Sequence, residues 1–146
     1  MLKYNDIKDA ITLKINTKFP NIEIYEEELQ QGFEEPAFFV QLIPINNIRK
    51  SKNIRNRLLL VDIQYFPKGS SREEAFNVAD TLEQIFIDYI RVKDRALKVD
   101  NVGYTVKYDG IGIILHFQIT IDYFEAIPKQ QDNLETINEI VLKKGV

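Results

Sequence analysis

The sequence predicts an α+β fold of two layers, a largely antiparallel five-stranded sheet with helices packed on one face, in the order α-β-β-β-α-β-β-α. Three observations predict it: segments with apolar residues at helical spacing, stretches in which apolar and polar residues alternate, and an Asp-Gly turn between two such stretches. Strands joined as hairpins favour an antiparallel sheet. The 146 residues, 45% of them hydrophobic, predict a single domain spanning 1–146.

The N-terminal half is expected to form one helix and three strands. Apolar residues recur at helical spacing from 7 to 19, and Pro20 ends this helix. Alternating patterns predict strands at 22–26 and 58–66, and a strand with apolar residues on both faces is predicted at 38–43. Pro44 either stops the second strand or marks it as an edge strand. The segment 46–56 is expected to be a long hairpin loop or the twisted ends of two strands.

Two further helices are predicted. Ser71 and Glu74 have the spacing of a capping box, and apolar residues follow on one helical face as far as Tyr89. A last helix is expected at about 133–143, peripheral to the domain, with Asp132 as a candidate N-cap. Lysines near the end of this segment suit the negative end of a helix dipole.

The strands before and after Asp109-Gly110 are expected to form a hairpin whose register follows from the turn. A two-residue turn at Asp109-Gly110 pairs Val106 with Ile113 and Val102 with Phe117. The apolar phase then slips at Asp100-Asn101, which predicts a bulge opposite Gln118. With that bulge, apolar pairing continues along the same face, Val99 with Ile119 and Leu97 with Ile121.

The composition argues against catalysis and against metal or cofactor binding. The chain has no cysteine, and His116 is its only histidine. Asp122 faces the same way as His116 but lies about 20 Å along the strand, so the two cannot form a general-base pair. No nucleophile is placed beside the histidine. We therefore expect no enzyme activity, no catalytic residues, no metal site and no cofactor.

Two charge clusters of opposite sign are the main candidates for partner contacts. The acidic stretch contains Glu26, Glu27, Glu28, Glu34 and Glu35. We interpret it as a solvated acidic rim and as a subunit interface. The basic loop contains Arg49, Lys50, Lys52, Arg55 and Arg57. Five cations without an acid suit an acidic protein patch or a polyanion, although a solvated hairpin tip is an equally good interpretation.

No apolar run reaches the length of a membrane span, and the N-terminus opens directly into a charged helical pattern. We therefore expect a soluble protein in a reducing cytoplasm, without membrane contact. Leu58, Leu60, Phe66 and Ile114 are expected on the sheet face opposite the main core. A sheet that is apolar on both faces needs a second cover, which a neighbouring subunit would supply.

Several segments together resemble a known family. They are Phe19 to Glu28, Gln31-Gly32-Phe33, Pro36-Ala37-Phe38-Phe39, Ile63 to Pro67, Asp109-Gly110 and Leu115-His116-Phe117. The chain from Asp6 to about Tyr123 is similar to the tail terminator (tail completion) proteins of tailed phages and prophages of Gram-positive bacteria. The resemblance rests on the order and spacing of ordinary residues and includes no catalytic motif.

The resemblance implies a virion structural protein of the tail, assembled in the bacterial host cytoplasm. It implies a homo-oligomeric ring, expected to be a hexamer, that caps the tail tube, stops tube polymerisation and forms the joint to the head. The implied partners are other copies of the chain, the tail tube protein and the head–tail connector or neck proteins, with DNA passing through the lumen without sequence-specific binding. Two alternatives are a head-completion or neck protein and a small nucleic-acid-binding module that uses the basic loop, 49–57.

Overall fold

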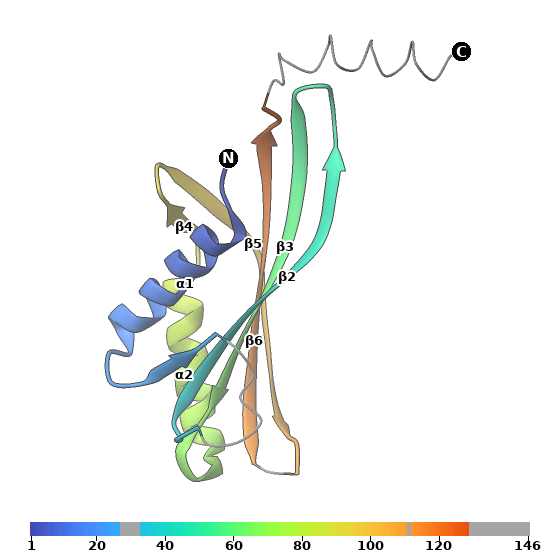
Figure 1. The fold of residues 1–146 in the computed structure, drawn as a ribbon. Helices are drawn as coiled ribbons and strands as arrows, with labels where there is room; N and C mark the ends of the chain where they lie inside the picture. The colour runs from blue at the N-terminus through green and yellow to red at the C-terminus, as the bar shows by residue number, and fades with distance from the viewer. Residues whose placement is uncertain (27–32, 111, 129–146) are drawn as a thin grey trace, which may run out of the picture.

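The computed structural model describes residues 1–26, 33–110 and 112–128 (Figure 1). Its helices are α1 (Tyr4–Lys18), the 3-10 helix η1 (Lys68–Ser70) and α2 (Arg72–Ile85). Its strands are β1 (Glu23–Tyr25), β2 (Ala37–Arg49), β3 (Ile54–Phe66), β4 (Tyr89–Val92), β5 (Arg95–Tyr108) and β6 (Ile113–Ala126). The predicted α+β class is confirmed. The predicted C-terminal helix, 133–143, lies outside the described residues.

The sheet has six strands in the order β1-β2-β3-β6-β5-β4, and it is mixed because β1 runs parallel to β2. The prediction of five strands was wrong in one element. The apolar positions between Leu82 and Tyr89 suggested one continuous helix, but α2 ends at Ile85 and the chain then forms β4. This strand has only four residues and buries Ile90 and Val92, so its alternation was too short to stand out from the preceding helical pattern.

Both α-helices pack on one face of the sheet, so the two-layer arrangement holds for the described residues (Figure 1). The inward stripe of α1 is Ile7, Ile11 and Ile15, all fully buried. Ser71 caps the start of α2, where its hydroxyl accepts a hydrogen bond from the Glu74 N–H at 3.2 Å. The Glu74 carboxylate accepts from the Tyr65 hydroxyl at 2.7 Å, so only the Ser71 half of the predicted capping box is formed. These helices and the facing sheet side chains form one hydrophobic core.

Strands β2 and β3 and the end of β6 extend past the helices as a projecting arm (Figure 1). Within the arm, the segment 46–56 takes the second of its two predicted forms, the twisted ends of two strands. A turn joins these strands, and in it the Lys50 and Ser51 N–H groups donate to the Ile54 carbonyl. Pro44 does not end β2. Among the described residues, β2 has no partner on its other side beyond Phe39. An edge strand tolerates a proline, and here a bulge follows it before Asn46.

The β5–β6 hairpin is present, but its predicted register is wrong by two residues. The chain reverses between Asp109 and Gly112, where the Asp109 N–H donates to the Gly112 carbonyl at 3.1 Å. The turn therefore begins one residue later than predicted. Val106 therefore pairs with Leu115. Because side chains alternate with a period of two, this shift leaves each residue on its predicted face and changes only its partner.

The bulge on β5 is confirmed, although it lies opposite a different residue. The register shifts between Val99 and Asn101, and Asn101 pairs with Thr120 instead of Gln118. Val99 pairs with Ile121 for the same reason. Leu97 does not continue this ladder: it pairs with Ile90 of β4, the strand that the sequence did not reveal.

Candidate assembly interfaces

The projecting arm carries apolar side chains that its own core does not cover. Cross-strand pairing places Ile48 and Phe124 beside Asn56 on the sheet face opposite the helices, and Ile54 lies on the same face of β3. Ile43 joins them through its pairing with Leu60. We call Ile43, Ile48, Ile54 and Phe124 the arm patch; they are 37%, 45%, 44% and 59% exposed. Contiguous exposed apolar side chains of this kind mark interaction surfaces.

The five residues of the basic loop occupy three different environments. Lys50 and Lys52 are exposed at the tip of the arm. Arg49 bends back onto the turn, where its guanidinium donates to the Ser51 and Lys52 carbonyls. Arg55 is half-buried on β3, and Arg57 is buried. The tip therefore presents two exposed lysines, and Arg57 belongs to the interior of the subunit.

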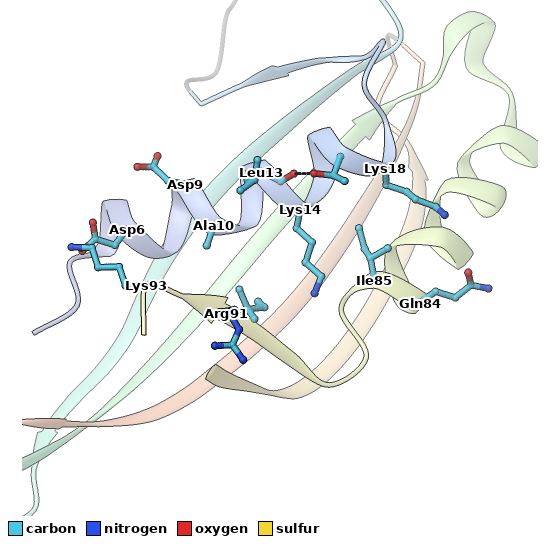
Figure 2. Close-up of a pocket in the computed structure, with 12 residues that line it drawn as sticks. Asp6, Asp9, Ala10, Leu13, Lys14, Lys18, Gln84, Ile85, Arg91 and Lys93 are labelled. Carbon is cyan, nitrogen blue, oxygen red and sulfur yellow. Dashed lines mark hydrogen bonds and ion pairs between the residues drawn. The ribbon is translucent and has the colours of Figure 1, made fainter. Parts of the chain in front are cut away.

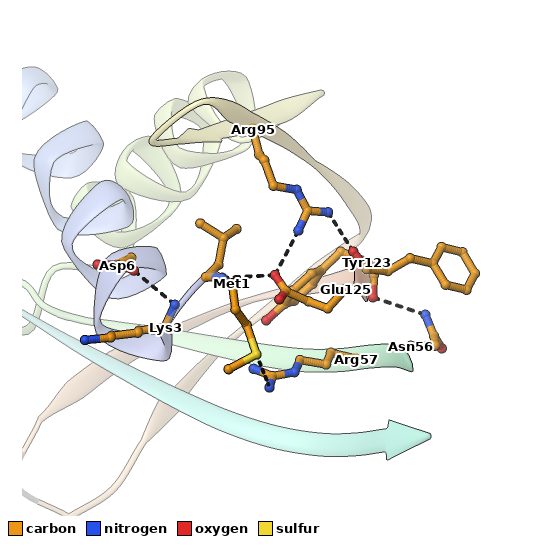
Figure 3. A network of polar contacts seen from close by, with 10 residues as sticks. Met1, Lys3, Asp6, Asn56, Arg57, Arg95, Tyr123 and Glu125 are labelled. Atoms are coloured by element: carbon orange, nitrogen blue, oxygen red, sulfur yellow. Dashed lines mark hydrogen bonds and ion pairs between the residues drawn. The ribbon is translucent and has the colours of Figure 1, made fainter. Parts of the chain in front are cut away.

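Arg57 lies in a network at the base of the arm, which also includes the N-terminus (Figure 3). Its guanidinium donates to the Met1 sulfur at 3.7 Å and lies over the Tyr4 ring, 5.3 Å from the centroid. Burial raises the pKa of the nearby Tyr123 hydroxyl, and the positive charge of Arg57 opposes that rise. The sequence analysis grouped Arg57 with the cations of the basic loop, whereas the structure buries it on β3.

Glu125 is the centre of this network (Figure 3). Glu125 is only 2% exposed. Its carboxylate accepts hydrogen bonds from the Leu2 N–H at 3.1 Å and from the Arg95 guanidinium at 2.8 Å. Arg95 also donates to the Phe124 carbonyl at 2.7 Å. One carboxylate thus ties the N-terminus, the start of β5 and the end of β6 together.

The acidic rim is only partly described. Glu26 forms an ion pair with Lys8 of α1, with 3.3 Å between the charged atoms, while Glu34 and Glu35 are exposed just before β2. Glu27 and Glu28 lie outside the described residues. Glu34 and Glu35 precede the start of β2 and the basic tip follows its end, so the two charge clusters lie at opposite ends of one strand.

An aromatic cluster covers the end of the sheet face opposite the helices. The Phe33 ring packs against the rings of Tyr25, Phe39 and Phe66, with centroid distances of 6.5, 5.4 and 4.9 Å. Ile114, on the same face of β6, is only 7% exposed. The sequence correctly predicted apolar residues on both faces. At this end, however, the chain supplies part of the second cover itself.

His116 has a carboxylate neighbour that the sequence analysis missed. Its Nδ1 lies 3.6 Å from Oδ2 of Asp62, and the Gln64 amide donates to that oxygen at 3.0 Å. Asp62 is 6% exposed, and its Oδ1 has no hydrogen-bond partner among the described residues. Asp122, the partner considered from sequence, instead accepts a hydrogen bond from Asn56. Knowing that β3 pairs with β6 would have revealed the Asp62 contact.

A groove of about 820 Å³ lies between α1, the end of α2 and β4 (Figure 2). Charged side chains from both sides reach over it, among them Lys14, whose ammonium group donates to the Tyr89 carbonyl at 3.4 Å. Ile85 and Ile90 contribute apolar lining. No nucleophile–base pair lines this groove, and the described ranges contain no group of acidic or histidine side chains that could hold a metal ion.

Within the described part of the chain, no helix is long and apolar enough to cross a membrane. Among solved structures, 22 chains match this one. One of them shares 11% sequence identity, covers 90% of this chain and all of its own length, and superposes with a TM-score of 0.52. At that identity the likeness shows the fold alone. No curated protein matches the sequence.

The family comparison confirms the resemblance found in the sequence. The model of the family described as phage tail terminator protein matches residues 6–133, which include most of α1, all of α2 and the six strands of the described sheet. A match of this extent covers most of the 146 residues. The chain therefore belongs to the phage tail terminator protein family, whose members are structural components of phage tails.

Proposed function

We propose that the chain forms a homo-oligomeric ring, a hexamer, that caps the tail tube, stops its polymerisation and forms the joint to the head. The match to the tail terminator family over residues 6–133 is the observation that carries this proposal. The projecting arm with its uncovered apolar side chains supports it, since such a surface is typical of a protein that assembles with others. The role is structural and requires no catalytic residue.

A closed ring needs two different complementary surfaces on each subunit, because every copy binds the next one head to tail. The basic tip and the acidic rim are two such surfaces. Lys50 and Lys52 lie at one end of β2, and Glu34 and Glu35 lie beyond its other end. In the ring, the basic tip of one subunit faces the acidic rim of the next. Exposed ion pairs contribute about 0–1 kcal/mol each, so charge sets the orientation and apolar contacts supply most of the affinity.

The proposal is tested by the mass of the particle in solution. Native mass spectrometry of the purified chain, alone and with its tail tube protein, should give a single closed oligomer, with six copies as the expected number. Added to polymerising tube protein, the chain should shorten tubes seen by electron microscopy and appear at one end only. A chain that stays monomeric with tube protein present, or that decorates tubes along their sides, would contradict the proposal.

Charge reversal at the arm tip should weaken the ring. Lys50→Glu combined with Lys52→Glu would bring two new glutamates against Glu34 and Glu35 of the next subunit. Because like charges would then face each other, we expect a clear loss of oligomer in native mass spectra. Reversing Glu34 and Glu35 to Lys in the same chain should restore part of it.

The matched control is Lys98→Glu with Lys107→Glu, two exposed lysines of β5 away from the tip. This control changes the net charge equally and should leave the ring intact. If the tip variant assembles normally, the tip instead contacts DNA or tube protein. A DNA contact would then appear as binding that falls steeply with salt.

A further inference from the structure

Strand β5 has a free edge over more than half of its length. Its first residues pair with β4, but this pairing ends at Lys98. From Asn101 to Tyr108, β5 pairs with β6 alone among the described residues. We call this stretch, 101–108, the β5 edge. It is longer than the usual strand of five or six residues, so a whole additional strand could pair along it.

The hairpin register shows which backbone groups of the β5 edge point away from β6. The Asp109 N–H donates to the Gly112 carbonyl, and in an antiparallel ladder hydrogen-bonded pairs alternate with pairs whose N–H and C=O point outward. The residues that point outward are therefore Val102, Tyr104, Val106 and Tyr108. The Val99 N–H agrees with this phase, because it donates away from β6 to the Asp88 carbonyl at 2.9 Å.

The β5 edge lacks the features that usually keep a strand from pairing. No charged residue and no proline occurs between Asn101 and Val106, and the bulge on β5 lies before this stretch. The edge of β2 differs, because Pro44 and the bulge after it interrupt it. Sheets carry prolines, bulges and charges on edges that must remain unpaired. The β5 edge is therefore the better suited of the two to receive an added strand.

The side chains along the β5 edge indicate what kind of strand it accepts. Tyr104 lies on the face that packs against the helices, with its ring 6.4 Å from that of Phe117, and Tyr108 shares this face. The two tyrosines are 39% and 65% exposed, so apolar residues at alternate positions of an added strand would cover them. On the other face, a Cβ at Gly103 would meet no atom within 4 Å. Packing within the described subunit does not require this glycine, and glycine inside a strand often marks the close approach of another backbone.

We propose that the β5 edge binds an extended segment of the tail tube protein, which adds to the sheet as a further strand. In strand addition, backbone hydrogen bonds supply the affinity and alternate side chains supply the specificity. The two charge clusters assigned above to contacts between copies lie at the ends of β2, and β3 and β6 separate β2 from β5. Ring formation through those clusters leaves the β5 edge open for a different partner. This inference rests on the proposed function, and it identifies the surface that holds the tube.

Amide hydrogen exchange resolved to single residues tests strand addition, because outward and inward amides alternate along one strand. In the chain alone, the amides of Tyr104 and Val106 should exchange freely, whereas those of Gly103 and Thr105, which point toward β6, should be protected. With purified tail tube protein bound, the amides of Tyr104 and Val106 should exchange at least about tenfold more slowly. Gly103 and Thr105 are the controls within the strand, and their exchange should change less.

A proline on the β5 edge provides a second test. Val106→Pro removes one outward N–H, and an edge strand tolerates a proline whose nitrogen faces solvent. Val106→Ala is the matched control, because it shortens the side chain but keeps the N–H. The proline variant should bind tube protein about tenfold more weakly than the alanine variant, the effect of losing about one hydrogen bond. Circular dichroism checks that both variants are folded; if the proline variant is not, exchange in the natural chain decides.

The outcomes distinguish this inference from the proposed function. If the chain does not bind tube protein at all, both are wrong. If it binds while the exchange of Tyr104 and Val106 stays fast, or if the two folded Val106 variants bind equally, strand addition alone is overturned. Protection of these two amides without tube protein would assign the β5 edge to the chain itself or to a second copy, which would also overturn the inference.

Discussion

Phe117→Ala is expected to lower the free energy of unfolding by about 3–5 kcal/mol, the usual cost of truncating a buried phenylalanine. Phe117 is fully buried on β6, the strand that joins the two halves of the sheet. Its ring lies 6.3 Å from that of Phe86 at the end of α2 and 6.4 Å from that of Tyr104 on β5. Truncation would open a cavity between the sheet and α2 that the rings of Phe86 and Tyr104 cannot fill.

Urea unfolding followed by circular dichroism measures this loss. Phe76→Ala is the matched control, because Phe76 is the same residue type on α2 but is 46% exposed. Surface substitutions usually change stability by no more than about 0.5 kcal/mol, so this variant should unfold close to the parent. Similar losses in the two variants would mean that β6 does not lie in the core as described.

The sequence predicted the elements that have long, regular patterns. The stripe of Ile7, Ile11 and Ile15 and the cap at Ser71 are local features, and both were found as predicted. The β5–β6 hairpin was also found, but its register depended on which two residues form the turn. Asp109-Gly110 satisfies the preference for positive φ, yet the chain reverses one residue later. Local turn preference is too weak to fix a register that long-range packing decides.

The features of the candidate interfaces that the sequence did not reveal depend on strand order. The contact between His116 and Asp62 arises because β6 lies beside β3 in the sheet, although 46 residues separate the two strands in the sequence. Arg57 was grouped with the exposed cations because hydrophobic alternation fades beyond Leu58, although the arm remains paired as far as Ile54. Partially exposed strands carry little apolar patterning, so sequence alone underestimates their length. The positions of the charge clusters in the assembled tail stay a prediction.

Glu125→Ala is expected to lower the free energy of unfolding by about 2–4 kcal/mol, because it removes the acceptor for two buried or half-buried donors. The Leu2 N–H and the Arg95 guanidinium would both lose their shared carboxylate. The Arg95 side chain is 37% exposed and can regain water, which keeps the loss below that of a fully buried ion pair. Glu125→Gln retains an acceptor oxygen without the charge and should lose about half as much.

The same substitution should also release the N-terminus from the arm, which a purely global loss of stability would not do. Under native conditions, amide hydrogen exchange at Leu2 and in the first turn of α1 should accelerate more than exchange at Ile119 in the core. Asp122→Ala is the control on the same strand, because Asp122 is exposed and its bond to Asn56 lies on the other face. It should leave exchange at Leu2 unchanged. Uniform acceleration across the chain in Glu125→Ala would show that the carboxylate stabilises the fold without anchoring the N-terminus to the arm.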